Sequence, residues 1–330
     1  MLRIHHRVGL INRSMRMVLP AMLALFLFGT SVVPAFAASP GKTVNASATL
    51  AYSLKGLRHN LAVQKAYIAS KYLYVTQRTG GTVYLSRLLM KGKTATYVDE
   101  MTITNSGHGQ TLDMYTYKNI DYFYFSSKAD GSTPYDWSLQ VARLKYAAGK
   151  KYDYTDLHRF TYMNYANKTG KRLGDTYRVD GGGNSAYTIF RVQTSQGSVT
   201  WSIYNTAALN KLLDSNEQVR MDSAAAKKAC VASVTQTGSK IVRPNNSFQG
   251  FDMLGSSEIY TSGGAEGQKP RIAMMSKTGA YKTLVNITNV GNHEIEGVQT
   301  KNGNVYFTIV TDPKNKKDTQ KVYYVHDSLF

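Results

Sequence analysis

Residues 249–253 read Gln-Gly-Phe-Asp-Met, and residues 296–299 read Glu-Gly-Val-Gln. Each segment begins with a polar residue, turns apolar, and is followed by an aromatic, strand-like segment: residues 259–261 after the first and residues 305–308 after the second. Similar pairs of segments begin earlier in the chain at Gln64, at Gln110 and, in a weaker form, at Asp175. A short unit that recurs along a chain is typical of repeat architectures, in which each unit buries its faces against its neighbours.

The repeated unit has the pattern of β-sheet. Beyond residue 50, apolar and polar residues alternate with period two, and Tyr and Phe are concentrated in the alternating segments, as in strands. Five units in residues 38–330 average about 59 residues each, which suits four-stranded sheets with some long loops. Sheets stacked radially bury both faces and leave only short edges. We therefore predict an all-β, five-bladed β-propeller. A β-sandwich is the alternative, because the repeat is weak and its period irregular.

One stretch interrupts the β pattern. Residues 206–228 contain Leu209, Leu213 and an alanine-rich run, which is typical of helix, and either Asp222 or Ser223 is placed to cap its second half. We predict a short helical insertion here, between the third and fourth units. Residues 38–61 are expected to add a closing strand to the last blade, with residues 43–50 as the candidate.

The N-terminus has the pattern of a secretory signal peptide. Residues 1–17 carry four arginines and no acid, residues 17–33 are apolar, and Ala35-Phe36-Ala37 is a small-x-small cleavage site. We predict a signal peptide over residues 1–37, cleavage after Ala37, and a secreted single domain over residues 38–330. The alternative is an uncleaved membrane anchor.

The composition is strongly basic, with 40 Lys+Arg against 21 Asp+Glu and a formal charge of +19. Removing the four arginines of residues 1–37 leaves +15 on the predicted secreted chain. For an exported protein this charge favours anionic wall polymers, membranes or surface receptors over nucleic acid. Cys230 is the single cysteine, so no intrachain disulfide exists. The candidate anionic contact residues, interleaved with tyrosines, are Lys145, Lys150, Lys151, Arg159, Lys168, Lys171 and Arg172.

Polar residues precede or begin the repeated segments, where a propeller has its central channel. The candidate channel residues are His59, Gln64, His108, Gln110, Gln249, Asp252, His293, Glu294 and Glu296. Such residues suit a binding site for a sugar or a metal, and they equally suit hydrogen bonds that join neighbouring blades. The sequence has no HExxH, CxxC or EF-hand motif, so we predict no cofactor. A calcium ion at the axis would fit the polar residues there, but no sequence motif supports it.

Catalysis has weaker support in the sequence. Paired acids can cleave glycosidic bonds, and Glu294 and Glu296 are the candidates for such a pair. Asp113 and Asp252 also lie near the predicted axis but within strands. The run Gly181-Gly182-Gly183-Asn184 lacks the strand-to-helix context of a phosphate loop and is interpreted as a turn. A hydrolase of cell-wall glycans is therefore the alternative to a non-enzymatic protein.

Several segments resemble the helveticin J family of large, heat-labile (class III) bacteriocins from lactic acid bacteria. They lie in order through the chain, and they include His108-Gly109-Gln110-Thr111, residues 137–144 (WSLQVARL), residues 247–252 (SFQGFD) and residues 293–299 (HEIEGVQ). The polar family motifs fall on His108/Gln110, Gln249/Asp252 and His293/Glu294/Glu296. Residues 174–190 depart from the family, since a His-containing segment expected there is replaced by residues 175–183.

The resemblance implies secretion and killing of related bacteria, without supplying a catalytic residue. We therefore expect a secreted antibacterial protein, a monomer, that binds the envelope of related Gram-positive cells through a wall polymer, an anionic membrane or a surface receptor. A non-lethal carbohydrate-binding or adhesion module is a further alternative.

Overall fold

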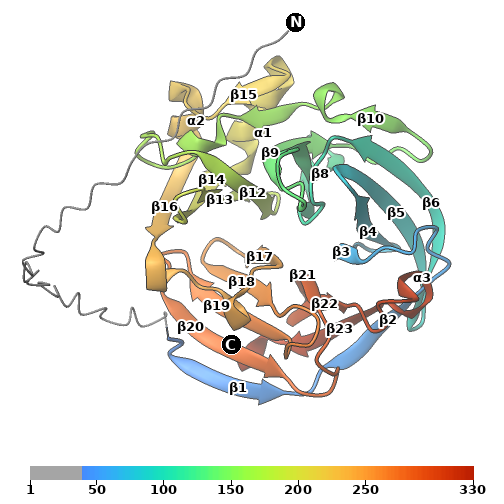
Figure 1. Ribbon diagram of the computed structural model, residues 1–330. Helices are drawn as coiled ribbons and strands as arrows, with labels where there is room; N and C mark the ends of the chain where they lie inside the picture. Colours follow the sequence, from blue (N-terminus) through green and yellow to red (C-terminus); the bar gives the residue numbers. More distant parts are fainter. Residues whose placement is uncertain (1–38) are drawn as a thin grey trace, which may run out of the picture. The chain divides into compact units, whose positions relative to one another are not determined.

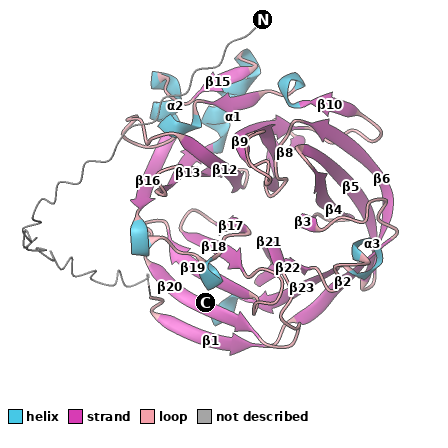
Figure 2. Cartoon of the chain, viewed as in Figure 1, coloured by secondary structure: helices cyan, strands magenta, loops and turns pink. Residues whose placement is uncertain are grey.

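Strands dominate the part of the chain that the computed structural model describes, residues 39–330 (Figure 2). The all-β prediction is confirmed, whereas the predicted signal peptide of residues 1–37 lies outside the described residues. The strands form sheets arranged around a common centre, toward which β3, β12, β17 and β21 extend (Figure 1). The described strands fall into five antiparallel units of four strands, and the first strand of each unit lies innermost.

The units follow one another along the chain. The first contains β3 (Val63–Ile68), β4 (Tyr72–Thr79), β5 (Thr82–Lys91) and β6 (Thr94–Thr104). The second contains β7 (Leu112–Tyr117), β8 (Ile120–Ala129), β9 (Ser138–Leu144) and β11 (Arg159–Thr161). The third contains β12 (Thr176–Gly183), β13 (Tyr187–Thr194), β14 (Val199–Asn205) and β16 (Cys230–Gln236). The fourth contains β17 (Gly250–Leu254), β18 (Glu258–Gly263), β19 (Arg271–Ser276) and β20 (Tyr281–Ile287). The last contains β21 (Ile295–Lys301), β22 (Asn304–Ile309), β23 (Lys321–His326) and β2 (Thr49–Lys55).

The N-terminal strand β2 joins the last unit to the first. It pairs antiparallel with β23 and parallel with β6, and so merges these two units into one sheet, which has nine strands because β10 (Lys151–Asp153) also pairs with β6. The predicted closing strand therefore exists, but it spans Thr49–Lys55 rather than residues 43–50. Residues 42–46 form a separate strand, β1 (Lys42–Ala46), which pairs in parallel with β20 of the fourth unit.

Short parallel strands cover other outer edges. Besides β1 on β20, β10 (Lys151–Asp153) pairs with β6, and β15 (Gln218–Arg220) pairs with β11. An exposed strand edge is a template for pairing with another chain, so these additions reduce the edge that each unit presents.

The predicted helices lie inside the third unit. Helices α1 (Thr206–Ser215) and α2 (Ala224–Ala229) connect β14 to β16, so their placement between the third and fourth units was wrong. Asn205 caps α1, and Ser223, one of the two predicted candidates, caps α2. The structure also has α3 (Lys316–Thr319) and short 3-10 helices at Tyr154–Asp156, Met163–Tyr165, Gly238–Lys240, Pro244–Asn246 and Asp327–Leu329. None of the helices within residues 39–330 is both long and apolar enough to cross a membrane.

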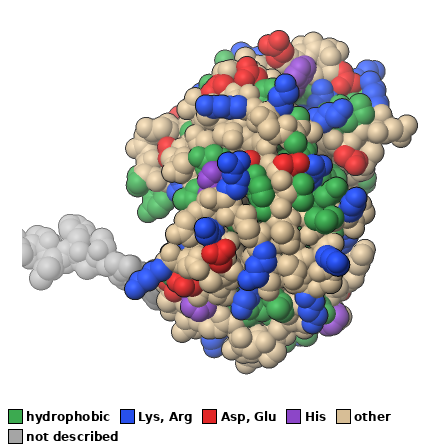
Figure 3. Space-filling model, turned by 90° about the vertical axis from the view of Figure 1, so that its right-hand side faces the viewer, with side chains coloured by type: hydrophobic (Ala, Val, Ile, Leu, Met, Phe, Trp, Pro, Cys, Tyr) green, Lys and Arg blue, Asp and Glu red, His purple; other side chains and the backbone are tan. Residues whose placement is uncertain are grey.

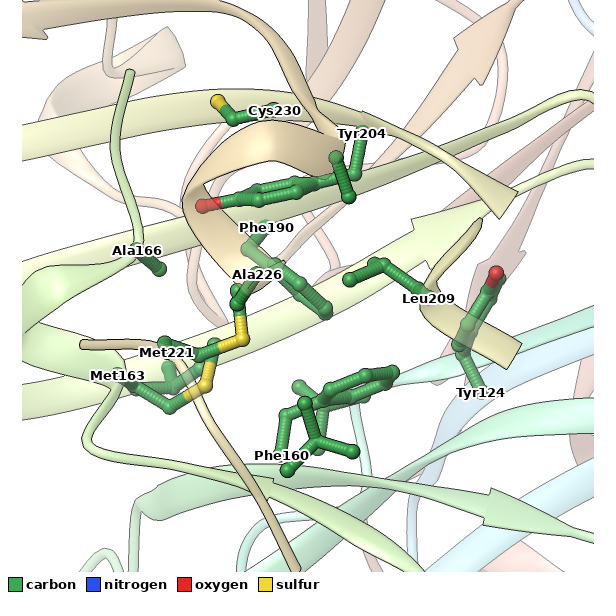
Figure 4. Packing of buried hydrophobic residues seen from close by; sticks show 14 of the residues in the cluster. Tyr124, Phe160, Met163, Ala166, Phe190, Tyr204, Leu209, Met221, Ala226 and Cys230 are labelled. Atoms are coloured by element: carbon green, nitrogen blue, oxygen red, sulfur yellow. The ribbon is translucent and has the colours of Figure 1, made fainter. Parts of the chain in front are cut away.

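A hydrophobic cluster fills each space between consecutive units, including the space between the last and the first. Figure 4 shows the cluster between the second and third units, where Phe160 of β11 and Phe190 of β13 pack with ring centroids 5.1 Å apart. Leu209 of α1 and Ala226 of α2 close the outer side of this cluster. The helices therefore replace strand packing where β11 is only three residues long.

The five inner strands contact one another in a closed ring, in the order β3, β7, β12, β17, β21 and back to β3. Glycines permit this close approach. A Cβ atom at Gly250 would lie 2.7 Å from Cα of Gly297, and one at Gly297 would lie 2.9 Å from Cγ of Lys65. Neither position has a positive φ. Glycine is therefore required here because there is no room for a side chain, and not because of the backbone conformation.

A buried lysine links the inner strands at the centre of the ring. Nζ of Lys65 on β3 lies 2.6 Å from Oδ1 of Asp113 on β7 and donates to the carbonyl of Phe251 on β17 at 2.9 Å. The other carboxylate oxygen of Asp113 accepts from the backbone N–H of Gly183 on β12. Burial raises the pKa of Asp113 to about 8, and the Lys65 ammonium opposes this rise.

Lys65→Met should destabilise the fold strongly. Removing the ammonium leaves Asp113 buried without its ion-pair partner, which typically costs about 3–5 kcal/mol. The double variant Lys65→Met/Asp113→Asn should recover part of this loss, because no unpaired carboxylate remains. The free energy of unfolding in urea measures both changes.

The control is Arg172→Met. Arg172 pairs with Asp175 at the surface, and such pairs contribute less than about 1 kcal/mol. Equal costs for Lys65→Met and Arg172→Met would contradict a central role for the buried pair.

Candidate functional site

A cavity of about 810 Å³ lies where the entrances of the inner strands converge. The candidate channel residues that line it are Gln64, His108, Gln249, Glu294 and Glu296. They come from four different units, so the structure brings together residues that are up to 232 positions apart in the sequence. The expectation that the strand entrances meet in space agrees with this geometry.

The other candidate channel residues lie elsewhere. His59 stacks on Tyr84 with ring centroids 3.7 Å apart and contacts Glu100. Asp252 accepts from the backbone N–H and the hydroxyl of Thr300. These two side chains therefore join neighbouring strands or loops and do not face the cavity.

Gln110 lies directly behind the cavity, and His293 lies beside its rim. Nδ1 of His293 is 3.3 Å from Oε1 of Glu266. Gln110 is buried and belongs to a hydrogen-bonded chain that crosses three units. Its Nε2 donates to Oε1 of Gln249 at 3.4 Å, and Nε2 of Gln249 donates to Oε1 of Glu294 at 3.1 Å. Its own Oε1 accepts from Arg178. The amides therefore hold the cavity wall together as well as facing it.

Two buried acceptors at the cavity have no hydrogen-bond partner within residues 39–330: Oε1 of Gln64 and Oε2 of Glu296. Nε2 of Gln64 donates to Oε1 of Glu296 at 3.2 Å, which fixes the two side chains against each other. A buried polar atom without a partner is costly in an isolated protein, and a ligand hydroxyl would satisfy it. The pair is therefore suited to receive hydrogen bonds from a polar ligand.

Both glutamates of the cavity have raised pKa values. Burial raises the pKa of Glu296 well above its usual range, and the neighbouring Glu294 adds to this rise. Burial also raises the pKa of Glu294, while Lys316 opposes the change. Asp113 and Asp252 do not line the cavity, so Glu294 and Glu296 are the carboxyl groups with access to a ligand among the four acids considered from the sequence.

Arg178 and Arg243 also line the cavity, and a third arginine, Arg191, is buried next to Arg178. Nε of Arg178 donates to Oδ2 of Asp180 at 2.9 Å, and Nη1 of the fully buried Arg191 lies 3.3 Å from the same oxygen. Nη2 of Arg191 donates to Oε1 of Gln193, which lines the cavity.

Aromatic side chains form a third part of the wall. Tyr135 and Trp137 stack with ring centroids 5.3 Å apart, and His108 packs on Trp137 at 4.2 Å. Nε1 of Trp137 donates to the hydroxyl of Tyr177 at 3.1 Å. Burial, together with the nearby charges of Arg78 and Arg178, lowers the pKa of His108 to about 3, so its ring is neutral at physiological pH. Planar aromatic surface beside polar groups is the usual composition of a small-molecule site.

Metal ligands do not gather here. In the described part of the chain, no group of three or more His, Cys, Asp or Glu side chains is placed to hold a metal ion. The residues present at the cavity offer mainly amides, guanidinium groups and aromatic rings, which suit an organic ligand better than a cation.

Sequence reasoning missed several residues of the site. Arg178 and Asp180 come from β12, within the segment 174–190 that departs from the family pattern. The run Gly181–Gly183, interpreted as a turn, is the end of this strand, and a Cβ at Gly182 would clash with the Asp113 carboxylate. Alternating charges within a strand normally indicate a solvated face, so Arg178, Asp180 and Arg191 gave no signal of burial.

The predicted anionic contact residues are mostly exposed. Arg159 is the exception, because it is 7% exposed and donates to the carbonyls of Thr155 and Leu157. Lys168 donates to the carbonyl of Cys230, and Arg172 pairs with Asp175. Figure 3 shows Lys and Arg side chains spread over one face of the molecule, with Asp and Glu side chains among them.

Glu296→Gln should make the free energy of unfolding depend less on pH as the pH rises. The folded state holds the Glu296 proton at pH values where the unfolded chain has released it. Ionisation of this group therefore opposes folding above the usual glutamate value of 4.5. The free energy of unfolding of the unmodified protein should fall relative to the variant as pH rises, by at most about 1.4 kcal/mol per pH unit. Urea unfolding between about pH 5 and pH 8 measures the difference.

Glu217→Gln at an exposed site is the matched control and should give a pH profile parallel to that of the unmodified protein. A parallel profile for Glu296→Gln would contradict a buried, proton-holding Glu296.

Solved structures resemble the fold only distantly. An exo-β-1,3-galactanase of Phanerochaete chrysosporium aligns with a TM-score of 0.45 and 8% identity, over 84% of this chain and 64% of that chain. A GH43_1 enzyme from Xanthomonas citri aligns with a TM-score of 0.37 and 8% identity, over 84% of this chain and 89% of that chain. Likenesses at this level carry no conclusion about activity.

Sequence comparison is more specific. Bacteriocin helveticin-J of Lactobacillus helveticus is 25% identical over 223 residues, which cover 62% of this chain and 66% of that protein, just under two thirds of its length. The family model described as bacteriocin helveticin-J matches residues 42–296. This match includes every cavity residue from Gln64 to Glu296. The resemblance inferred from the short motifs is thereby confirmed, and the chain belongs to the bacteriocin helveticin-J family.

Proposed function

We propose that this protein is a secreted antibacterial protein that binds the envelope of related Gram-positive bacteria and inhibits or kills them. Membership of the bacteriocin helveticin-J family supports a bacteriocin-like function. The signal-peptide pattern of residues 1–37 and the charge of +15 beyond it are consistent with export toward an anionic cell surface.

The fold that we propose for this function is a five-bladed β-propeller. The closed ring of inner strands and the hydrophobic cluster between each consecutive pair of units support this assignment. Two sheets packed face to face would instead share one core. A radial arrangement also explains why polar strand entrances from all units meet at one cavity.

The cavity is the proposed binding site, and its ligand is a sugar unit of a wall polymer. The observation that carries this proposal is the combination of a stacked aromatic wall with two buried, unpartnered acceptors at the same cavity. Sugar rings present apolar faces that stack on Trp and Tyr, and their hydroxyls donate to amide and carboxyl oxygens. Trp137 and Tyr135 supply the first contact, and Gln64 and Glu296 supply the second.

The purified protein should bind and inhibit bacteria related to its source. Incubation with a panel of such strains, followed by growth curves and by detection of cell-bound protein, measures both effects. Release of reducing sugars from isolated walls would instead indicate a glycan hydrolase, and binding without inhibition would indicate an adhesion module. Absence of both binding and inhibition across the panel would contradict the proposal.

Trp137→Ala should weaken binding to isolated cell walls about tenfold, because the variant loses the stacking surface at the cavity. Trp137→Phe should retain part of the affinity. Sedimentation of the protein with increasing amounts of wall material measures the change. Tyr72→Ala is the control, since Tyr72 is an aromatic residue that stacks with Arg87 outside the cavity. Equal effects of Trp137→Ala and Tyr72→Ala would argue against the cavity as the binding site.

A further inference from the structure

We infer that the cavity selects a negatively charged sugar, one that carries a carboxylate or a phosphate group. Arg178 and Arg243, which line the cavity, receive this group, and the buried Arg191, which shares Asp180 with Arg178, adds to the positive charge beside them. This inference rests on the proposed function, because it names the chemical class of ligand for the same cavity. It goes further in assigning an anion subsite, which neither the family nor the sequence motifs indicate.

Arg178, Arg191 and Arg243 are incompletely neutralised. Within residues 39–330, Asp180 is the only carboxylate within ion-pair distance of these arginines, and it contacts Arg178 and Arg191. Arg243 forms no ion pair in the same part of the chain, so three guanidinium groups share one carboxylate. Two positive charges therefore remain on this side of the cavity.

Two of the three guanidinium groups, those of Arg178 and Arg191, are held in place by packing and are buried. Phe248 lies between two guanidinium groups, with Cζ of Arg191 3.7 Å and Cζ of Arg178 4.7 Å from its ring centroid. Nε of the fully buried Arg191 has no hydrogen-bond partner among the described residues. Burial lowers the pKa of Arg191 to about 9, and Arg178 and Arg243 contribute to this drop. Arg178 and Arg191 are therefore fixed and buried, while Arg243 is exposed beside them. Buried, fixed cations attract an anion more strongly than flexible surface lysines do.

The negative charge on the acidic side of the cavity is weakened. The pKa values of Glu294 and Glu296 are raised by burial, which favours their neutral forms. Asp136 lies 3.7 Å from Arg78, which also lines the cavity, so that carboxylate already has a cationic partner. The cavity thus has a polar, hydroxyl-accepting side and a cationic side.

The aromatic wall adjoins the cationic side of the cavity. Cζ of Arg178 lies 4.0 Å from the ring centroid of Trp137, so a sugar stacked beside this indole has its substituents next to the guanidinium groups. Guanidinium forks match both carboxylate and phosphate geometry. Two wall components offer this chemistry: muramic acid whose lactyl carboxylate carries no stem peptide, and the phosphodiester of teichoic acids.

Isothermal titration calorimetry with soluble probes tests the inference. The anionic probes are the disaccharide of N-acetylglucosamine and N-acetylmuramic acid, and a short glycerol-phosphate oligomer. The neutral probes are the same disaccharide with its carboxylate reduced to an alcohol, and an N-acetylglucosamine oligomer. We expect at least one anionic probe to bind about tenfold or more tightly than its neutral counterpart, the effect of one charge-assisted contact. The anionic probe that binds identifies the source.

Arg243→Gln is the decisive variant because Arg243 is exposed, lines the cavity and is not needed for an ion pair. It should reduce the preference for the anionic probe about tenfold while leaving the neutral probes unaffected. Lys277→Gln, which removes an exposed charge away from the cavity, should leave the preference unchanged.

The inference is overturned if anionic and neutral probes bind equally, if no probe binds, or if Arg243→Gln retains the full preference. Binding to whole cells is measured separately in the same preparations. Cell binding without a preference for anionic probes would refute the anion subsite and leave the proposed function standing, whereas loss of cell binding would refute the proposed function itself.

Discussion

The position of Lys65 at the centre of the inner-strand ring constrains the rest of the structure. Its ammonium group contacts β7 through Asp113 and β17 through the carbonyl of Phe251, while its stem packs against Gly297 of β21. Asp113 extends the same network to β12 through Gly183. A charge in so dry a place is tolerated only when every partner is in position, so the network favours one mutual arrangement of all five strands.

This constraint also determines where the cavity lies. The glycines bring the inner strands close together and the Lys65–Asp113 pair occupies the space between them, whereas the cavity lies at the strand entrances. The side chains there line a space that they do not fill, and their hydrogen bonds run along its wall from Glu294 through Gln249 and Gln110. Structural and ligand-facing roles are therefore combined in the same amides, since each amide has both a donor and an acceptor to satisfy.

The sequence allowed the strand content, the recurrence of units and the convergence of Gln64, Gln249 and Glu296 to be predicted. Each of these rests on local pattern, either alternation or a polar residue at a fixed place in a repeat. The buried charges were not predictable in this way, because Lys65 and Arg191 lie in strands whose alternation is the same whether a charged side chain meets solvent or a partner.

The third unit shows what local sequence patterns could not predict. Its residues 174–190 depart from the family pattern, yet this unit contributes Arg178 and Gln193 to the cavity wall. The glycine run was misread for a related reason. Glycine is common in turns, and nothing local indicates that Asp113, some 70 residues earlier, needs the space that Gly182 leaves.

The pairing of β2 with both β23 and β6 has a consequence for how the chain reaches its native state. A strand near the start of the described chain acquires its antiparallel partner only from residues 321–326, so the last contacts of the ring span nearly the whole polypeptide. Long-range pairing of this kind is slow, because the chain loses conformational entropy before the favourable contacts between the strands form. Until this pairing forms, β2 and β6 both have unpaired edges. A chain that stalls during folding, or that lacks its C-terminal strand, is therefore prone to pair with the strand of another molecule and to aggregate.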